Sequence, residues 1–185
     1  MISRTTFGGV CCAAASYGSF AGADPTMLDD FDLNPQARGD HFADGVMGGV
    51  SDGGVTFVAD AATAFARKTG TVSTENNGSF LQTRRLLPRG LPAGTEGLKL
   101  ETRGNGAACY VFLRTRVMPP PWYFYNAAFQ STKPRSQVCI PLTVLERSQD
   151  FLADPIDPQT VIGIGLVACG RDPVADLSAA SVAVY

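Results

Sequence analysis

Short apolar segments, broken every few residues by turn-forming residues, dominate this chain from Asp29 onward. The breaks contain Gly, Pro, Asn and Asp, which favour turns because they tolerate or impose backbone angles that strands and helices disfavour. No stretch keeps the 3.6-residue apolar period of an amphipathic helix over about 11 positions. The pattern therefore argues against a helical bundle and predicts an all-β fold, a sandwich or a barrel.

The alternating segments predict a series of strands, at Gly54–Ala59, Ala66–Ser73, Ser79–Arg85, Gly97–Arg103, Ala107–Arg116, Trp122–Gln130, Ser136–Ile140, Val161–Ala168 and Ser178–Tyr185. The link Gly104–Gly106 is the strongest hairpin signal, because Gly and Asn accept positive φ angles. Pro119–Pro121 and Asp154–Pro158 impose extended connections. No internal repeat or long linker divides the body, so residues 27–185 are predicted to form one domain.

Residues 1–26 differ from the body and are treated as a separate N-terminal arm. Arg4 precedes a run of small residues, and Ala21-Gly-Ala23 follows, which is the pattern of a cleaved export signal. Residues 3–7 also resemble a twin-arginine export motif, although Thr5 stands where the second arginine belongs. The apolar run is far shorter than the ~20 residues that span a bilayer, so no transmembrane segment is predicted. Two compartments stay open: the periplasm if residues 1–23 act as a degenerate signal, and otherwise the cytoplasm.

The charged and metal-binding residues exclude several classes of function. The 15 basic and 17 acidic side chains nearly cancel and form no long run, so no nucleic-acid partner is expected. His41 is the single histidine; it excludes a His-rich metal site, and we interpret it as a surface or capping residue. Cys109, Cys139 and Cys169 form no C-x-x-C pair and are flanked by apolar residues, which predicts small buried side chains on strands. We expect neither a metal nor a cofactor.

Alternation along the strands divides their side chains between two faces. On the segment 107–116, one face carries Cys109, Val111, Leu113 and Thr115, and the other carries Ala108, Tyr110, Phe112 and Arg114. On the segment 97–103, Leu98 and Leu100 face inward, opposite Lys99, Glu101 and Arg103. Neighbouring strands add two further sets, Phe80, Gln82 and Arg84, and Trp122, Phe124, Asn126 and Gln130. If these outward sides lie together, they form an aromatic and arginine-containing surface that could stack a sugar or hold a partner's loop. The alternative is that the aromatic rings belong to the core and the arginines to a solvated rim.

Two segments have a specific order of residues, Asp44-Gly-Val-Met-Gly-Gly-Val-Ser-Asp52 and Gly70-Thr-Val-Ser-Thr-Glu-Asn-Asn-Gly-Ser-Phe80, the second followed by Arg84. Gly97-Leu-Lys-Leu-Glu-Thr-Arg-Gly-Asn-Gly106 and Ile162-Gly-Ile-Gly165 continue the pattern. Together they resemble the complex I intermediate-associated protein 30 family, from about Phe31 to Val184. The chain departs from that pattern where Gly39 replaces a common tryptophan, Ser79 a glycine and Asn105 an aspartate.

The resemblance implies a galactose-binding-like jelly-roll β-sandwich, similar to that of a family of glucan-binding modules. It also implies a role as an assembly factor of respiratory NADH:ubiquinone oxidoreductase (complex I), with complex I subunits or assembly intermediates as partners. No catalytic residues are associated with the family, so a non-enzyme is expected. A carbohydrate-binding module of the cell envelope, with an oligosaccharide ligand, is the alternative. An enzyme that uses a carboxylate pair such as Glu75 and Asp44 is the weakest hypothesis, because nothing fixes the distance between them.

The motif residues have physical interpretations beside the resemblance. Gly48 and Gly49 permit a tight turn that presents Met47 or lets a ligand approach, or that serves the architecture alone. Glu75-Asn76-Asn77 offers a carboxylate and two amides to a sugar hydroxyl, to a partner's backbone or to its own turn. A pair between Glu75 and Arg84 or Arg103 would instead be structural. The candidate binding residues are Asp44, Met47, Gly48, Gly49, Glu75, Asn76, Asn77, Arg84, Arg103, Tyr110, Arg114 and Trp122.

Overall fold

The computed structural model describes residues 25–32, 39–43, 52–60, 63–71, 80–117, 123–169 and 174–185. Within these ranges the chain is nearly all β, with short 3-10 helices at Leu142–Val144 and Pro158–Thr160. The strands are β1 (Thr26–Asp29), β2 (Gly39–Ala43), β3 (Asp52–Asp60), β4 (Thr63–Thr71), β5 (Phe80–Leu86), β6 (Gly97–Gly104), β7 (Ala108–Thr115), β8 (Tyr125–Gln130), β9 (Ser136–Pro141), β10 (Glu146–Arg147), β11 (Val161–Cys169) and β12 (Val174–Val184).

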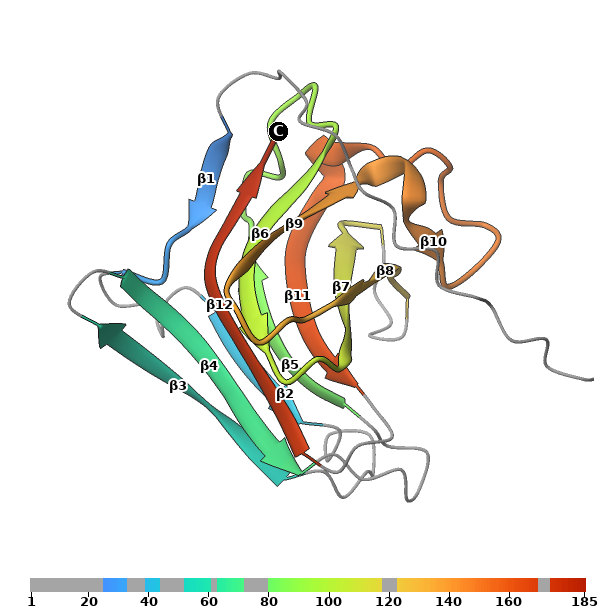
Figure 1. Ribbon diagram of the computed structural model, residues 1–185. Coiled ribbons are helices and arrows are strands. Elements are labelled where there is room, and N and C mark those ends of the chain that lie inside the picture. The colour runs from blue at the N-terminus through green and yellow to red at the C-terminus, as the bar shows by residue number, and fades with distance from the viewer. Residues whose placement is uncertain are drawn as a thin grey trace, which may run out of the picture.

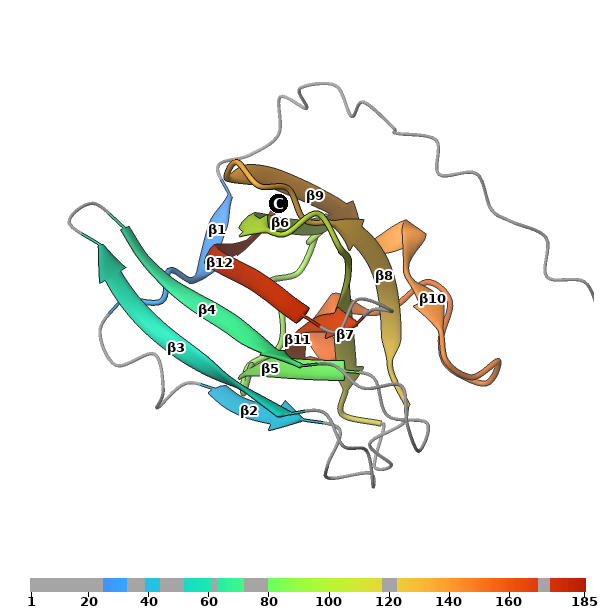
Figure 2. The same cartoon turned by 60° about the horizontal axis from the view of Figure 1, so that its bottom comes forward.

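The described strands form two antiparallel sheets that pack as two layers (Figures 1 and 2). The first sheet has the order β3-β4-β12-β6-β9, and β1 pairs with the C-terminal part of β12. The second sheet has the order β10-β8-β7-β11-β5-β2. Strands that follow one another in sequence therefore often lie in different sheets. This arrangement confirms the predicted all-β jelly-roll sandwich.

The link Gly104–Gly106 does not close a hairpin, so that prediction was wrong. β6 pairs with β12 and β9 in the first sheet, whereas β7 pairs with β11 and β8 in the second. The turn chemistry itself is as expected: Gly106 has φ +94°, and the side-chain Oδ1 of Asn105 accepts a hydrogen bond from the backbone N–H of Ala107 at 3.1 Å. Turn residues mark where the chain reverses, but packing across the core decides which strand becomes the partner.

The predicted strands are all present, with ends that differ by up to four residues, as at β12, which begins at Val174 instead of Ser178. Three of the described strands were not predicted: β1, β2 and β10. They contain four, five and two residues, too few for an alternating pattern to stand out from their polar neighbours. These three strands are held by their neighbours in the sheets.

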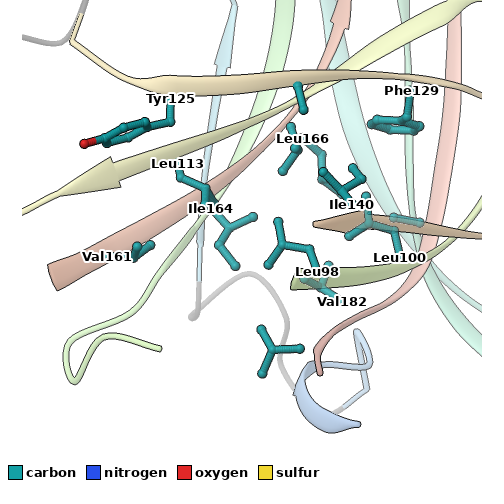
Figure 3. Close-up of a cluster of buried hydrophobic side chains, with 14 of the residues drawn as sticks. Leu98, Leu100, Leu113, Tyr125, Phe129, Ile140, Val161, Ile164, Leu166 and Val182 are labelled. Carbon is teal, nitrogen blue, oxygen red and sulfur yellow. The ribbon is translucent and has the colours of Figure 1, made fainter. Parts of the chain in front are cut away.

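The hydrophobic core lies between the sheets and contains the inward faces that alternation predicts. Leu98 and Leu100 of β6 and Val111 and Leu113 of β7 are fully buried. Figure 3 shows Leu98, Leu100 and Leu113 with side chains of β8, β9, β11 and β12, including Tyr125, Ile140, Ile164 and Val182. Full burial of one such side chain contributes about 1.5–3 kcal/mol. The core thus joins two sheets whose described strands do not pair with each other.

Two charged side chains also connect the layers. Asp29 of β1, in the first sheet, is buried and forms an ion pair with Arg85 of β5, in the second, with 3.1 Å between Oδ2 and Nε. Lys68 of β4 points into the interior, where its Nζ donates a hydrogen bond to the backbone carbonyl of Leu166 in β11. Buried charges need such partners, because an unpaired one is costly away from water.

The prediction that the cysteines are buried holds for one cysteine and fails for another. Cys109 is buried in the core, as expected, whereas Cys139 is exposed, which corrects the prediction for that residue. Val138 and Ile140 face the core, and residues adjacent in a strand point to opposite faces, so Cys139 points outward. When both neighbours of a strand residue face the core, the residue between them faces solvent, which is the case for Cys139. The side chain of Cys169 lies outside the described part.

Candidate functional site

The outer face of the second sheet brings together the polar and aromatic side chains that alternation placed outward. Two rows cross it: Gln82, Val167, Tyr110 and Ala128 in one, and Arg84, Gly165, Phe112 and Asn126 in the next. Arg114 follows beside Gly163, one row further along. We call this surface the platform, and define it by Gln82, Arg84, Tyr110, Phe112, Arg114 and Asn126. The outward sides of β5, β7 and β8 thus lie together.

Two glycines of β11 make room for the platform. A Cβ atom on Gly165 would lie 2.2 Å from Nε2 of Gln82, and one on Gly163 would lie 3.5 Å from Cδ of Arg84. The side chains of Gln82 and Arg84 therefore extend across β11. In the sequence, Gly163 and Gly165 were identified only as part of the family pattern. Two glycines spaced by two in a strand lie on the same face, and this spacing could have predicted the open space there.

The aromatic rings of the platform pack on one another. Phe112 and Phe124 stack with 4.3 Å between ring centroids and 6° between planes, and Tyr110 meets Phe112 edge-on at 6.4 Å. All three residues are half-buried, and Val167, flanked by Tyr110 and Gln82, is fully buried. Offset and edge-on contacts of this kind stabilise the rings where they are. Much of the ring surface is therefore already used within the protein.

Arg84 and Arg114 lie close enough on the platform to influence each other. Burial lowers the pKa of Arg114 from its usual range, and the positive charge of Arg84 lowers the pKa further. The Nε atoms of both side chains are hidden from solvent. Half-buried guanidinium groups donate hydrogen bonds to carboxylates, carbonyls and hydroxyls in a fixed planar geometry. The platform thus combines apolar rings with two positive charges.

Arg103, by contrast, does not join them. It lies on β6 in the first sheet and points to the outer face of that sheet, with its guanidinium carbon 5.6 Å from the centroid of the Phe65 ring. The three arginines singled out in the sequence therefore occupy two faces. The remaining candidates, Asp44, Met47, Gly48, Gly49, Glu75, Asn76, Asn77 and Trp122, lie outside the described residues, and so does any pair of Glu75 with an arginine.

The strand ends that flank the two motif segments can be located. Ala43 pairs with Leu81, Asp52 with Thr71, Thr71 with Val174, and Phe80 with Cys169. The strand ends that meet in these pairs, those of β2, β3, β4, β5, β11 and β12, lie at the lower end of the sandwich in Figure 1. The described strand ends on either side of residues 44–51 and 72–79 are therefore at the end of the platform where Gln82 and Tyr110 lie.

The described ranges contain no group of three His, Cys, Asp or Glu side chains placed to hold a metal ion. None of the helices in the same ranges is long and apolar enough to cross a membrane. The candidate side chains that the structure describes lie on the outer faces of the two sheets. Fold and surface together define the class as jelly-roll β-sandwiches of the galactose-binding type, a fold that non-catalytic binding modules use.

Solved structures with this fold include two of the family 11 carbohydrate-binding module of Clostridium thermocellum. The module of the cellulosomal cellulase Lic26A-Cel5E has a TM-score of 0.68 at 12% identity, over 89% of this chain and 95% of that one. The module in complex with a β-1,3-1,4-mixed-linked tetrasaccharide also has a TM-score of 0.68, at 13% identity, over 89% and 96%. The family 30 module of the cellulase Cel9D-Cel44B, from the same organism, has a TM-score of 0.52 at 14% identity, over 74% and 90%.

The sequence pattern of one family covers most of the chain. The chain belongs to the complex I intermediate-associated protein 30 family, which matches residues 32–175. No curated protein matches the chain. The family that the motifs indicated is thus confirmed, and the structural likenesses confirm the fold that the resemblance implied.

Proposed function

We propose that this protein is a non-catalytic binding module that assists assembly of respiratory NADH:ubiquinone oxidoreductase by binding its subunits or assembly intermediates through the platform. The observation that carries the proposal is the gathering of Tyr110, Phe112, Arg84 and Arg114 on one outer face. Aromatic residues and arginine are enriched where proteins bind one another. Membership of the family supports the choice of complex I as the partner.

The packing of the rings favours a protein partner over a sugar. A sugar-binding platform presents a flat ring face, whereas Phe112 uses one face against Phe124. A protein loop can instead contact ring edges and the half-buried guanidinium groups together.

Recovery of complex I subunits with the tagged full-length chain, expressed in its own cell, tests the proposal. Ala128 is exposed on β8 and paired with Tyr110, so Ala128→Arg blocks the platform without removing an interaction. Ala93→Arg, at an exposed position between β5 and β6, is the matched control. We expect subunits with the unchanged chain and with Ala93→Arg, and a loss of at least about fivefold with Ala128→Arg. An unchanged chain that recovers no complex I subunit would contradict the proposal.

A carbohydrate-binding function is the second candidate, and the fold favours it. The chain shares its fold with carbohydrate-binding modules at a TM-score of 0.68, one of them in complex with a mixed-linked tetrasaccharide. Titration of that tetrasaccharide, followed by the fluorescence of Trp122, the single tryptophan, tests this function. A saturable change that Ala128→Arg abolishes would support sugar binding on the platform. No change up to millimolar sugar would exclude this ligand.

A further inference from the structure

A second cluster of charged side chains covers the outer face of the first sheet, on the opposite side of the core from the platform. Arg67 of β4, Ser178 of β12 and Arg103 of β6 form one row across three neighbouring strands. Adjacent strands lie about 4.8 Å apart, which places the Cα atoms of Arg67 and Arg103 about 10 Å apart. We call this surface the Arg103 face, and define it by Phe65, Arg67, Lys99, Glu101, Arg103, Arg135, Asp176 and Ser178.

Two of its arginines are held by carboxylates. Arg67 binds Asp176 with both ends of its guanidinium group, at 3.2 Å between Nε and Oδ1 and 3.1 Å between Nη2 and Oδ2. The hydrogen bond and the charge of Asp176 raise the pKa of Arg67 above its usual range. Nη1 of Arg135 lies 3.7 Å from Oε1 of Glu101 and donates a hydrogen bond to Thr63 Oγ1 at 3.2 Å.

Arg103 is held differently. Its exposed guanidinium lies over the buried ring of Phe65, and no carboxylate in the described part of the chain pairs with it. The ring attracts the cation and limits its freedom, but it leaves the N–H groups of the planar fork available. Such a fork can bind a carboxylate through two parallel hydrogen bonds.

The charges around Arg103 favour an acidic partner at the surface. Ser178 and Ala180 of β12 lie among Phe65, Arg103, Glu101 and Arg135, where the surface has only a slight depression. Arg67, Lys99, Arg103 and Arg135 outnumber Glu101 and Asp176 on this face, although the whole chain has a net charge of −2. Local positive charge of this kind steers and orients an acidic partner.

We propose that the Arg103 face docks an acidic segment of a partner protein, with Arg103 as its anchor. The carboxylates of Glu101 and Asp176 interrupt the positive charge, which disfavours a continuous phosphate backbone and suits a protein segment with mixed side chains. This surface is separate from the platform, so the proposal goes beyond the proposed function. Two faces on opposite sides of one sandwich would let the module contact two partners at once.

Fluorescence polarisation of a fluorescein-labelled hexaglutamate peptide, with the full chain at low salt, tests the proposal. Arg103→Gln removes the anchor charge, and Arg89→Gln removes an equal charge from an exposed position between β5 and β6. We expect Arg103→Gln to weaken binding at least about fivefold and Arg89→Gln less than about twofold, with affinity falling as salt rises. Both positions are exposed, and equal melting temperatures would verify that the variants fold.

Two results would overturn the proposal. One is no peptide binding by the unchanged chain up to millimolar concentration, including the case in which a heparin oligosaccharide binds instead. The other is an equal loss with Arg103→Gln and Arg89→Gln, which would mean that net charge alone is responsible. Ala128→Arg is expected to leave peptide binding unchanged, so failure of the platform and failure of the Arg103 face are distinguishable.

Discussion

Asp29 connects the two layers through a single carboxylate. One of its oxygens lies 3.1 Å from Nε of Arg85, and the other accepts a hydrogen bond from the backbone N–H of Phe31 at 2.9 Å. Asp29→Asn keeps the shape but removes the negative charge that faces Arg85 inside the protein. We expect the free energy of unfolding to fall by about 2–4 kcal/mol, measured by urea denaturation at pH 7. Asp150→Asn, at an exposed position, is the control and should stay within about 0.5 kcal/mol; equal losses would show that the buried pair contributes nothing specific.

Cys109 and Cys139 should react very differently. Burial raises the pKa of the Cys109 thiol, although Lys68 and Ser131 act in the opposite direction. Alkylation by iodoacetamide under native conditions, followed by peptide mass spectrometry, should modify Cys139 at least about tenfold faster. Unfolding in urea should remove the difference, and similar native rates would contradict the burial of Cys109.

The same thiol should make the fold less stable in alkaline solution. In the unfolded chain the thiol loses its proton at a lower pH than in the folded chain, so the unfolded state binds fewer protons there. The free energy of unfolding contributed by Cys109 is thus complete below the ordinary thiol pKa and is lost as pH rises through the raised value. Urea denaturation of the unchanged chain and of Cys109→Ala between pH 7 and 10 measures this loss of stability. If the free energy of unfolding falls with pH as steeply in Cys109→Ala as in the unchanged chain, the prediction is contradicted.

β6 ends at a glycine because the backbone of β12 and the side chain of Ser131 approach it closely. A Cβ atom on Gly104 would lie 2.7 Å from the carbonyl oxygen of Asp176 and 2.5 Å from Oγ of Ser131. Since the backbone carbonyl cannot move aside, Gly104→Ala should lower the free energy of unfolding by about 1–3 kcal/mol. Gly54 of β3 has open space around it, so Gly54→Ala should cost nothing and gain up to about 1 kcal/mol. Urea denaturation of both variants is the measurement, and equal effects would contradict the role of close approach at Gly104.

The strands were predictable to the extent that each one carries its own alternation. In β7 the division of the side chains into two sets follows from spacing alone, because the alternation is uninterrupted, whereas the structure decides which set faces the core. β10, with two residues, forms only because β8 offers it a pairing partner. The sheet to which β6 and β7 belong could not be predicted either, because the link between them has the chemistry of a hairpin turn whichever partner the strands take.

The candidate site was predictable in part, and for the same reason. Alternation places Arg84, Tyr110 and Arg114 outward, and the pairing of β5, β11 and β7 in one sheet then brings them to one face. Arg103 also points outward, but from the other sheet, which no local pattern reveals. The contact between the Arg103 guanidinium and the Phe65 ring joins β6 and β4, which are separated in the sheet by β12. Such a contact depends on topology and not on spacing.

The two ends of the described chain meet in the first sheet, and this determines where the domain must begin. β1 lies beside β12 and pairs with its residues 182–184 (Figure 1). Leu28 and Phe31 pack on the core. A chain that starts at residue 33 loses this pairing, both side chains and the Asp29–Arg85 pair. We expect its free energy of unfolding to fall by more than about 5 kcal/mol in urea denaturation.

A chain that starts at residue 25 keeps all of these contacts. It should unfold with a free energy within about 0.5 kcal/mol of that of the full chain, because β1 and its partners on β12 are retained. A clear loss on removal of residues 1–24 would instead make that arm part of the fold. Retained stability would mean that the sandwich, with its two outer faces, folds without the arm, so its binding can be measured without the sequence that decides the compartment.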